Sequence, residues 1–370
     1  VAYRFKPDMD TFMREWLALY ESKSGERGIF NRQSAIKQAS KNGRRDVEQE
    51  FGCNPCSEII LRPYQFCNLT EVVVRESDTE ETLIQKVKLA TILGTYQSTL
   101  TDFKYLRKIW KDNTEEERLL GVSLTGIMDN ALLSGKSAKI GNNIEGLLTK
   151  LRETAVETNK KVSAKLGIPQ STAVTTVKPS GTVSQLVDSA SGIHARHNPH
   201  YIRTVRGDNK DPLTQFMVAQ GIPSEPDVMK PQSTTVFSFP MQAPSTAVFR
   251  QDMTAIEQLD IWLKYQTYWC EHKPSVTISV KEHEWLEVGA WVYEHFDEVS
   301  GISFLPFSEH TYKQAPYQDC TEVEYKDMLS KMPKGIDWRA LSEFEKEDTT
   351  SGSRELACTA GVCEVVDISA

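Results

Sequence analysis

The stretch CNPCSEIILRPYQFC, residues 53–67, holds three of the chain's seven cysteines. A disulfide, a zinc site, a thiol redox pair and radical chemistry would each leave cysteines here. Cys53 and Cys56 form a C-x-x-C, which alone fits a thioredoxin-like pair or half of a zinc site. A thioredoxin-like motif opens a helix, whereas here the apolar run 59–61 follows and Arg62-Pro63 closes it. We therefore expect Cys56 on a loop that leads into a strand.

The composition is that of an ordinary globular protein. The chain has 370 residues, of which 39% are hydrophobic and 25% charged, so one large or two medium domains are expected. A net charge of -8 disfavours nucleic acid as a partner. We find no apolar run of membrane-spanning length and no signal peptide, and we expect a cytoplasmic protein without a membrane partner. In a reducing compartment, cysteines are more often catalytic, metal-binding or core residues than structural disulfides.

Helical and strand-like patterns alternate along most of the chain. Helical spacing of apolar residues predicts helices over residues 10–22, 80–99, 144–166, 254–270 and 282–296. Short apolar runs predict strands over residues 172–177, 275–280 and 301–307. This alternation predicts an α/β fold with parallel strands.

A second motif, TTVKPSGTVSQL at residues 175–186, reads as a strand that turns into a helix. Backbone N–H groups and hydroxyls at such a helix start can bind an anion, and Gly181 would allow a phosphate to approach closely. Taken alone, Pro-Ser-Gly-Thr is also an ordinary turn.

The C-terminal part differs in kind. Residues 345–355, EKEDTTSGSRE, are polar and without periodicity, which predicts a mobile linker. Beyond it, CTAGVC places Cys358 and Cys363 near the end. A flexible tether with two thiols could visit a distant site; the alternative is a disordered tail with incidental cysteines.

NPCSEI, with Cys67 eleven residues after Cys56, resembles the active-site loop of ribonucleotide reductases. The resemblance implies that Cys56 becomes a thiyl radical that removes the 3′ hydrogen of the ribose. Asn54 and Glu58 would hold and deprotonate the sugar hydroxyls, and Cys67 would be one of two thiols that supply electrons and become a disulfide. A sulfur radical takes a carbon-bound hydrogen reversibly, and a general base at the neighbouring hydroxyl assists loss of the 2′ hydroxyl.

The same resemblance assigns the other motifs. It implies that Ser180, Gly181, Thr182, Val183 and Ser184 bind the phosphates of a ribonucleoside di- or triphosphate. The pair Cys358 and Cys363 resembles the shuttle that re-reduces the active-site disulfide by thiol exchange. A thioredoxin-like protein or a small dithiol would then reduce the shuttle.

Within this family the sequence is most similar to the adenosylcobalamin-dependent branch, whose monomeric members reduce triphosphates. We find neither the Tyr-Tyr pair of the branch that uses a separate radical subunit nor a glycyl-radical motif, while GISFLPFSEHTYKQAPY, residues 301–317, resembles the adenosylcobalamin enzymes. His194, His197 and His200 have no nearby acidic or cysteine ligand in the sequence, so no protein-bound metal is expected.

The resemblance implies part of a ten-stranded α/β barrel with an active-site finger loop. Residues 1–340 would form the C-terminal portion of the barrel and 341–370 a flexible redox tail. Only 53 residues precede Asn54. The first barrel strands, an effector site and the thiol partner of Cys67 would thus come from a companion chain, or the sequence is partial. Three alternatives remain: a reductase large subunit needing a separate radical-generating subunit, a catalytically silent assembly or regulatory subunit, and a C-x-x-C thiol-disulfide carrier.

Overall fold

The structure is a computed structural model that describes residues 2–25, 28–136, 143–307 and 312–346. These residues form two compact units. The first contains the described residues up to Arg196 and those from Pro244 to 307, and the second contains His197–Ala243 with residues 312–346. The sequence had suggested one barrel portion over residues 1–340; the contacts divide this range between the two units. Of the predicted redox tail, residues 347–370, with Cys358 and Cys363, lie outside the described residues.

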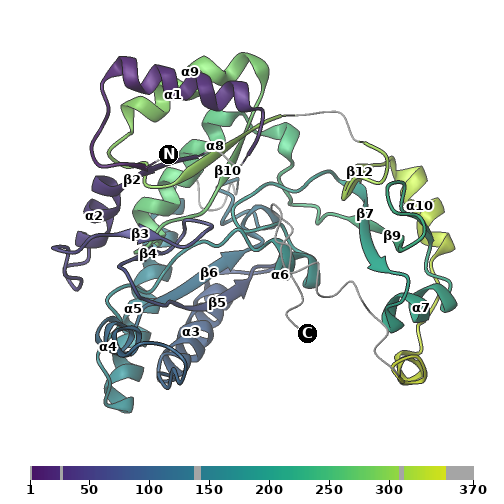
Figure 1. The fold of residues 1–370 in the computed structure, drawn as a ribbon, viewed down its shortest axis with the longest axis horizontal. Helices are drawn as coiled ribbons and strands as arrows, with labels where there is room; N and C mark the ends of the chain where they lie inside the picture. The colour runs from purple at the N-terminus through teal and green to yellow at the C-terminus, as the bar shows by residue number, and fades with distance from the viewer. Residues whose placement is uncertain (1, 26–27, 137–142, 308–311, 347–370) are drawn as a thin grey trace, which may run out of the picture. The chain divides into compact units, whose positions relative to one another are not determined.

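Strands of the first unit pair mainly in parallel (Figure 1). The eight strands are β1 (Ala2–Tyr3), β2 (Gly28–Asn31), β3 (Gly52–Cys53), β4 (Ile60–Leu61), β5 (Asn68–Val73), β6 (Leu120–Thr125), β10 (Thr277–Val280) and β11 (Ile302–Pro306). β5 pairs with β6, β10 with β11 and β1 with β2 in parallel, whereas β11 and β2 are antiparallel. Isolated parallel bridges join Val122 to Thr175 and Val177 to Pro274, so the segment 175–177 lies between β6 and the residues just before β10.

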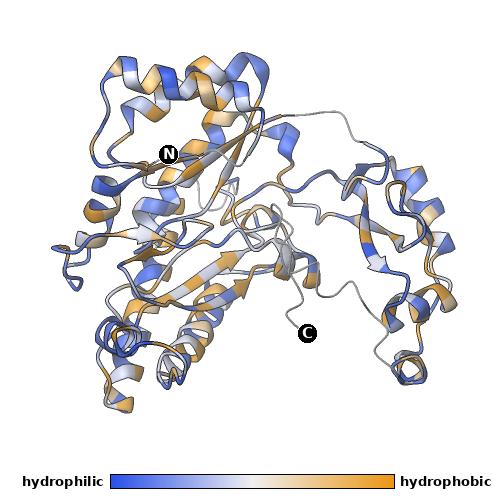
Figure 2. Cartoon of the chain, in the orientation of Figure 1, coloured by the Kyte–Doolittle hydropathy of each residue, from blue (hydrophilic) through white to orange (hydrophobic). Residues whose placement is uncertain are grey.

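Helices flank these strands. They are α1 (Met9–Ser22), α2 (Arg32–Ser40), α3 (Glu80–Gln97), α4 (Lys108–Glu117), α5 (Ile144–Leu166), α6 (Gly181–Leu186), α8 (Ala255–Lys264) and α9 (Trp285–Glu294). Short turns of helix occur at Ile127–Asp129, Arg250–Asp252, Tyr265–Trp269 and Glu282–Glu284. α3 packs on α5, β5 and β6. Figure 2 shows that apolar residues concentrate along β5 and β6.

The prediction of α5 is confirmed in full, because its ends are encoded locally. The Asn143 side chain accepts a hydrogen bond from the backbone N–H of Gly146 at the start, and Gly167, with φ 67°, adopts the left-handed conformation that ends the helix. Of the other four predicted helices, 10–22 is present and begins one residue earlier, 80–99 ends two residues earlier, and 254–270 and 282–296 are each divided into two helical segments. The predicted strand 172–177 forms only the isolated bridges at Thr175 and Val177.

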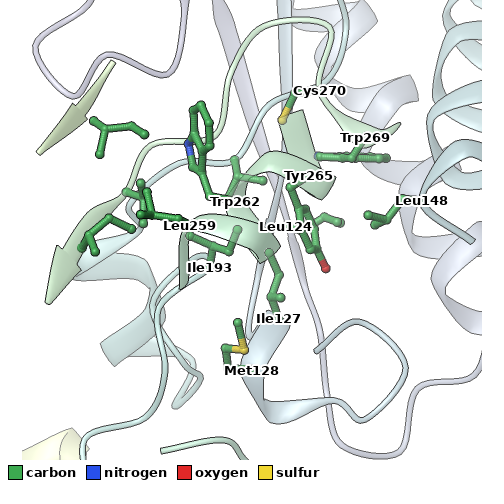
Figure 3. Packing of buried hydrophobic residues seen from close by; sticks show 14 of the residues in the cluster. Leu124, Ile127, Met128, Leu148, Ile193, Leu259, Trp262, Tyr265, Trp269 and Cys270 are labelled. Carbon is green, nitrogen blue, oxygen red and sulfur yellow. The ribbon is translucent and has the colours of Figure 1, made fainter. Parts of the chain in front are cut away.

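Buried aromatic residues at the end of α8 anchor the core of the first unit (Figure 3). The Trp262 indole N–H donates to the Pro274 carbonyl at 2.9 Å, and that of Trp269 donates to the Thr176 carbonyl at 2.7 Å. The Tyr265 hydroxyl donates to the Leu133 carbonyl at 2.8 Å. These three buried polar atoms are thereby paired, and the Trp269 contact ties the core to Thr176, which lies next to the site described below.

The second unit is an antiparallel sheet with helices. Its strands are β7 (His200–Asp208), β8 (Ser224–Pro226), β9 (Thr234–Gln242) and β12 (Tyr317–Asp319), in the order β12-β7-β9-β8. α7 (Pro212–Ala219), α10 (Glu322–Lys331) and a 3₁₀ helix, Trp338–Glu343, complete it. Phe216 packs against Trp338 with ring centroids 5.4 Å apart. Among the described residues of the chain, no helix is both long and apolar enough to cross a membrane.

Candidate active site

The cysteine stretch forms a hairpin whose tip carries Cys56. β3 and β4 pair antiparallel, with Cys53 opposite Ile60. Between them, the backbone N–H of Ser57 donates to the Asn54 carbonyl at 2.9 Å, which closes a tight turn. The Asn54 side-chain oxygen accepts from the N–H of Ile59 at 3.0 Å. The expectation that Cys56 lies on a loop leading into a strand is confirmed, and Asn54 fixes the shape of that loop.

Cys56 is exposed on the wall of a cavity of about 410 Å³. Cys53, Pro179, His194 and Thr277 are among the other lining residues. Partial burial, reinforced by the negative charge of Glu58, raises the pKa of the Cys56 thiol. The sulfur at neutral pH is therefore a protonated thiol, which has a hydrogen atom to give up.

Glu58 does not line this cavity; its side chain is fully buried behind the hairpin. One carboxylate oxygen, Oε1, accepts from Lys178 Nζ at 3.0 Å. The other, Oε2, has no hydrogen-bond partner within the part of the chain that the structure describes. The Glu58 carbonyl accepts from the Thr176 hydroxyl at 3.1 Å and from the backbone N–H of Lys273 at 3.1 Å. The carboxylate is thus held firmly, with one oxygen available as an acceptor.

Cys67 lies between the hairpin and β5, packed against Gly121. A Cβ atom at Gly121 would lie 3.2 Å from the Cys67 sulfur and 2.4 Å from a Leu69 methyl group, so a larger residue there would force neighbouring side chains to move. Burial, together with the charge of Glu58, raises the pKa of Cys67. Cys67 is outside the lining of the Cys56 cavity. It therefore shares the neighbourhood of Glu58 with Cys56 but not its cavity.

The second motif begins at the cavity and continues into α6. Pro179 lines the cavity wall, and Ser180, with φ 54°, turns the chain into the helix. The Ser180 hydroxyl donates to Glu71 Oε2 at 2.8 Å. In the rest of the segment, Ser184 is buried, whereas the residues from Gly181 to Val183 are exposed. Their backbone groups are accessible to a ligand beside the cavity.

Two lysines of this site were not recognised in the sequence. Lys178 pairs with Glu58 across 120 positions of the chain. Lys273 is fully buried; its Nζ donates to the Ser300 carbonyl at 2.9 Å and to the Ser57 hydroxyl at 3.4 Å, and lies 4.5 Å from the centre of the Phe30 ring. Burial lowers the pKa of Lys273 to about 8. Lys178 belongs to the TTVKPSGTVSQL motif, so the motif could have identified it as a candidate site residue. Lys273 belongs to no motif recognised in the sequence.

The hairpin also rests on a buried polar network. The backbone N–H of Ile60 donates to His272 Nδ1 at 3.3 Å, and the Ile60 carbonyl accepts from Arg45 at 2.8 Å. Arg45 makes two hydrogen bonds of 2.9 Å to the Glu117 carboxylate. Burial and the Arg45 charge lower the pKa of His272 to about 3, so the imidazole is neutral. These contacts fix β4 and therefore the position of Cys56.

Both ring nitrogens of His194 are occupied: Nδ1 donates to the Ser191 carbonyl at 2.9 Å, and Nε2 accepts from the N–H of Thr277 at 3.1 Å. Burial lowers the pKa of His194. In the described residues, no group of three or more histidine, cysteine, aspartate or glutamate side chains is placed to hold a metal ion.

Comparison with known proteins identifies the fold around this site. Models of protein families give no match. An adenosylcobalamin-dependent ribonucleoside-triphosphate reductase of Euglena gracilis is 27% identical over 321 residues, covering 85% of this chain and 42% of the relative. Its counterpart in Lacticaseibacillus paracasei is 26% identical over 382 residues, covering 94% of this chain and 50% of the relative. The solved structure of a B12-dependent class II ribonucleotide reductase superposes with a TM-score of 0.76 over 94% of this chain, at 24% identity. Over most of its length the chain is therefore similar to adenosylcobalamin-dependent ribonucleotide reductases and shares the fold of the class II enzyme.

This reductase-like chain spans about half the length of the curated relatives it matches. A class Id ribonucleotide reductase alpha subunit of Actinobacillus ureae shares the fold more distantly, with a TM-score of 0.53 and 13% identity. In the relatives the matched region is part of one longer chain, so they give no support to a separate companion chain. The α/β fold predicted from the sequence is confirmed.

Proposed function

We propose that the chain carries the radical half of a ribonucleotide reductase, which converts ribonucleotides to 2′-deoxyribonucleotides. The observation that supports this most is the exposed Cys56 thiol on a fixed hairpin beside a cavity, with the buried Glu58 carboxylate two residues further on. A thiyl radical at Cys56 would take the 3′ hydrogen. Asn54 and Glu58 would hold the sugar hydroxyls, and Glu58 would accept a proton as the 2′ hydroxyl leaves as water.

This role requires the Glu58 carboxylate to become accessible from the cavity. Its unpaired Oε2 is the atom that would accept a hydrogen bond from a sugar hydroxyl. The Lys178–Glu58 pair of 3.0 Å is then the contact that substrate binding would rearrange.

The residues present fit adenosylcobalamin as the radical source. When bound, adenosylcobalamin would supply an organic radical able to take a hydrogen atom from a thiol. Cys56 meets the requirement on the protein side, because it is exposed and its raised pKa keeps the hydrogen on sulfur. Ser275, Thr277 and Ser303 on the cavity wall offer hydroxyl groups to hold a nucleoside-sized group.

The substrate would be a ribonucleoside di- or triphosphate. Its phosphates would lie at Ser180–Ser184, where Gly181, Thr182 and Val183 are exposed next to the cavity residue Pro179. Two electrons would come from Cys67 and a second thiol as they form a disulfide. Cys358 and Cys363 would reduce that disulfide, and a thioredoxin-like protein or small dithiol would regenerate the pair.

We infer that further polypeptide completes a ten-stranded barrel, in the same chain or as a companion. Among the described strands, β5 pairs only with β6, so one edge of β5 is available for another strand. Leu93, Tyr96 and Leu100 are exposed beside this edge, where a groove of about 550 Å³ is also lined by Leu69.

The cytoplasmic location expected from the sequence stays a prediction.

Product formation by the completed protein tests this function. With adenosylcobalamin, dithiothreitol and a ribonucleoside di- or triphosphate, we expect a deoxyribonucleotide, detected by chromatography. Glu58→Gln keeps the shape of the side chain and should slow the reaction by roughly 10²–10⁴, as expected for loss of a general base. An unchanged rate would remove Glu58 from the mechanism. Absence of product from the folded, completed wild-type protein with both substrate types would contradict the function.

A further inference from the structure

Cys53 has no role in the proposed chemistry, yet it lies in the same cavity as Cys56. Both cysteines are free and exposed, and both line the cavity of about 410 Å³. The tight turn closed by Ser57 N–H and the Asn54 carbonyl begins directly after Cys53 and contains Cys56. Two accessible thiols in C-x-x-C spacing are the arrangement used for reversible disulfide chemistry.

We propose that Cys53 and Cys56 are a modification site for small-molecule disulfides, which convert the pair reversibly into an internal disulfide. The Cys53 thiolate attacks one sulfur of the small disulfide, forming a mixed disulfide and releasing one thiol. The Cys56 thiolate then attacks the Cys53 sulfur, forming the Cys53–Cys56 bond and releasing the second thiol. The two cysteines lose two electrons and two protons in total, and the small disulfide gains them.

The surroundings favour Cys53 as the first nucleophile. Cys53 is exposed in the cavity and interacts electrostatically with the ammonium group of Lys273. Cys56 is instead disfavoured as a thiolate, because burial and the Glu58 charge raise its pKa. Once the mixed disulfide has formed on Cys53, Cys56 is only three residues away from it. The attack is then intramolecular, and this proximity compensates for the lower reactivity of the Cys56 thiol.

Cys67 is the competing partner, and its environment opposes it. Its sulfur packs against Gly121 and lies outside the lining of the cavity. Burial, with the Glu58 charge, raises its pKa, so the thiolate population is small. A small disulfide in the cavity therefore meets Cys53 and Cys56 before it meets Cys67.

The consequence for activity rests on the proposed function. If Cys56 is the radical thiol, the disulfide removes its hydrogen atom and stops turnover until a dithiol reduces the bond. Formation of the disulfide itself does not depend on that function, so the two can fail separately.

Peptide mapping tests the proposal on the chain as it is. The reduced protein is incubated anaerobically with oxidised glutathione, remaining thiols are alkylated at low pH, and the protein is cleaved after glutamate. Cleavage after Glu50, Glu58 and Glu71 gives Phe51–Glu58, which contains Cys53 and Cys56, and Ile59–Glu71, which contains Cys67. We expect Phe51–Glu58 to lose the mass of two hydrogen atoms and to escape alkylation, with Ile59–Glu71 alkylated. Dithiothreitol should reverse the change.

Matched variants make the result specific. Cys67→Ser should leave the internal disulfide of Phe51–Glu58 unchanged, and Cys53→Ser should abolish it, leaving only glutathione adducts. The proposal is overturned if the two peptides become joined as the main product, or if Phe51–Glu58 stays fully alkylated while the folded protein forms adducts elsewhere. If the disulfide forms but a turnover-competent preparation keeps its rate, the role of Cys56 fails and the modification site stands.

Discussion

Replacement of Lys273 by methionine tests the buried charge beneath the Cys56 hairpin. Burial lowers the pKa of Lys273 from 10.5 to about 8. A pKa difference of one unit corresponds to about 1.4 kcal/mol. When Lys273 is protonated in both the folded and the unfolded state, its burial therefore lowers the unfolding free energy by about 3 kcal/mol. The hydrogen bond to the Ser300 carbonyl and the contact with the Phe30 ring offset part of this loss. At pH 7, the net effect of Lys273→Met on stability should therefore be small.

The pH dependence is the sharper result. Between the folded and unfolded pKa values, the unfolded state binds more protons, so the wild-type protein gains stability as pH rises from about 8 to 10.5. Lys273→Met lacks this gain. The difference in unfolding free energy between the two proteins, measured by urea denaturation, should shift by about 2–3 kcal/mol in favour of wild type between pH 7 and pH 10. Lys88→Met, on an exposed side chain of α3, is the control. A difference that stays constant with pH would refute the buried-charge interpretation.

Three further perturbations test the site. A Cβ at Gly301 would lie 2.0 Å from the Ser57 hydroxyl oxygen, so Gly301→Ala should destabilise the protein by about 1–3 kcal/mol in urea denaturation; no loss would show that the hairpin yields freely. Lys178→Met leaves a buried charge unpaired and should lower stability by about 3–5 kcal/mol, and adding Glu58→Gln should recover most of it; additive losses would contradict the pairing. Because the pKa of His272 is about 3, stability should fall as pH drops from 6.5 towards 3, and His272→Gln should flatten that part of the pH curve; an equal slope would exclude His272 as its source.

Local signals in the sequence account for much of the fold. The apolar stripe and the capping residues of α5 fixed both of its ends, because they act within one turn of the helix. The C-x-x-C followed by an apolar run correctly placed Cys56 on a loop before β4. The segment 172–177 was less predictable. It makes backbone hydrogen bonds along residues 117–122, but these produce isolated bridges and no regular ladder, and the regularity of the pairing depends on the neighbouring segments.

The contacts within the candidate site could not be predicted from the sequence alone. Lys178 and Glu58 are 120 positions apart, and Lys273 and Ser57 are 216 apart, so no local pattern reports these contacts. The full burial of Glu58 also depends on packing between distant segments. The sequence alone therefore pointed to Cys56 and Glu58 as candidate site residues, whereas the neighbouring cations Lys178 and Lys273 are apparent only in the folded structure.

Deoxyribonucleotide formation by a Cys56→Ser variant tests the central claim most directly. The completed protein, adenosylcobalamin, a ribonucleotide and dithiothreitol would be used, with Cys320→Ser, a half-buried thiol of the second unit, as the matched control. We predict no product from Cys56→Ser, because a serine oxygen radical is far harder to form, and wild-type product from Cys320→Ser. Appreciable turnover by Cys56→Ser would contradict the assignment of Cys56 as the radical thiol.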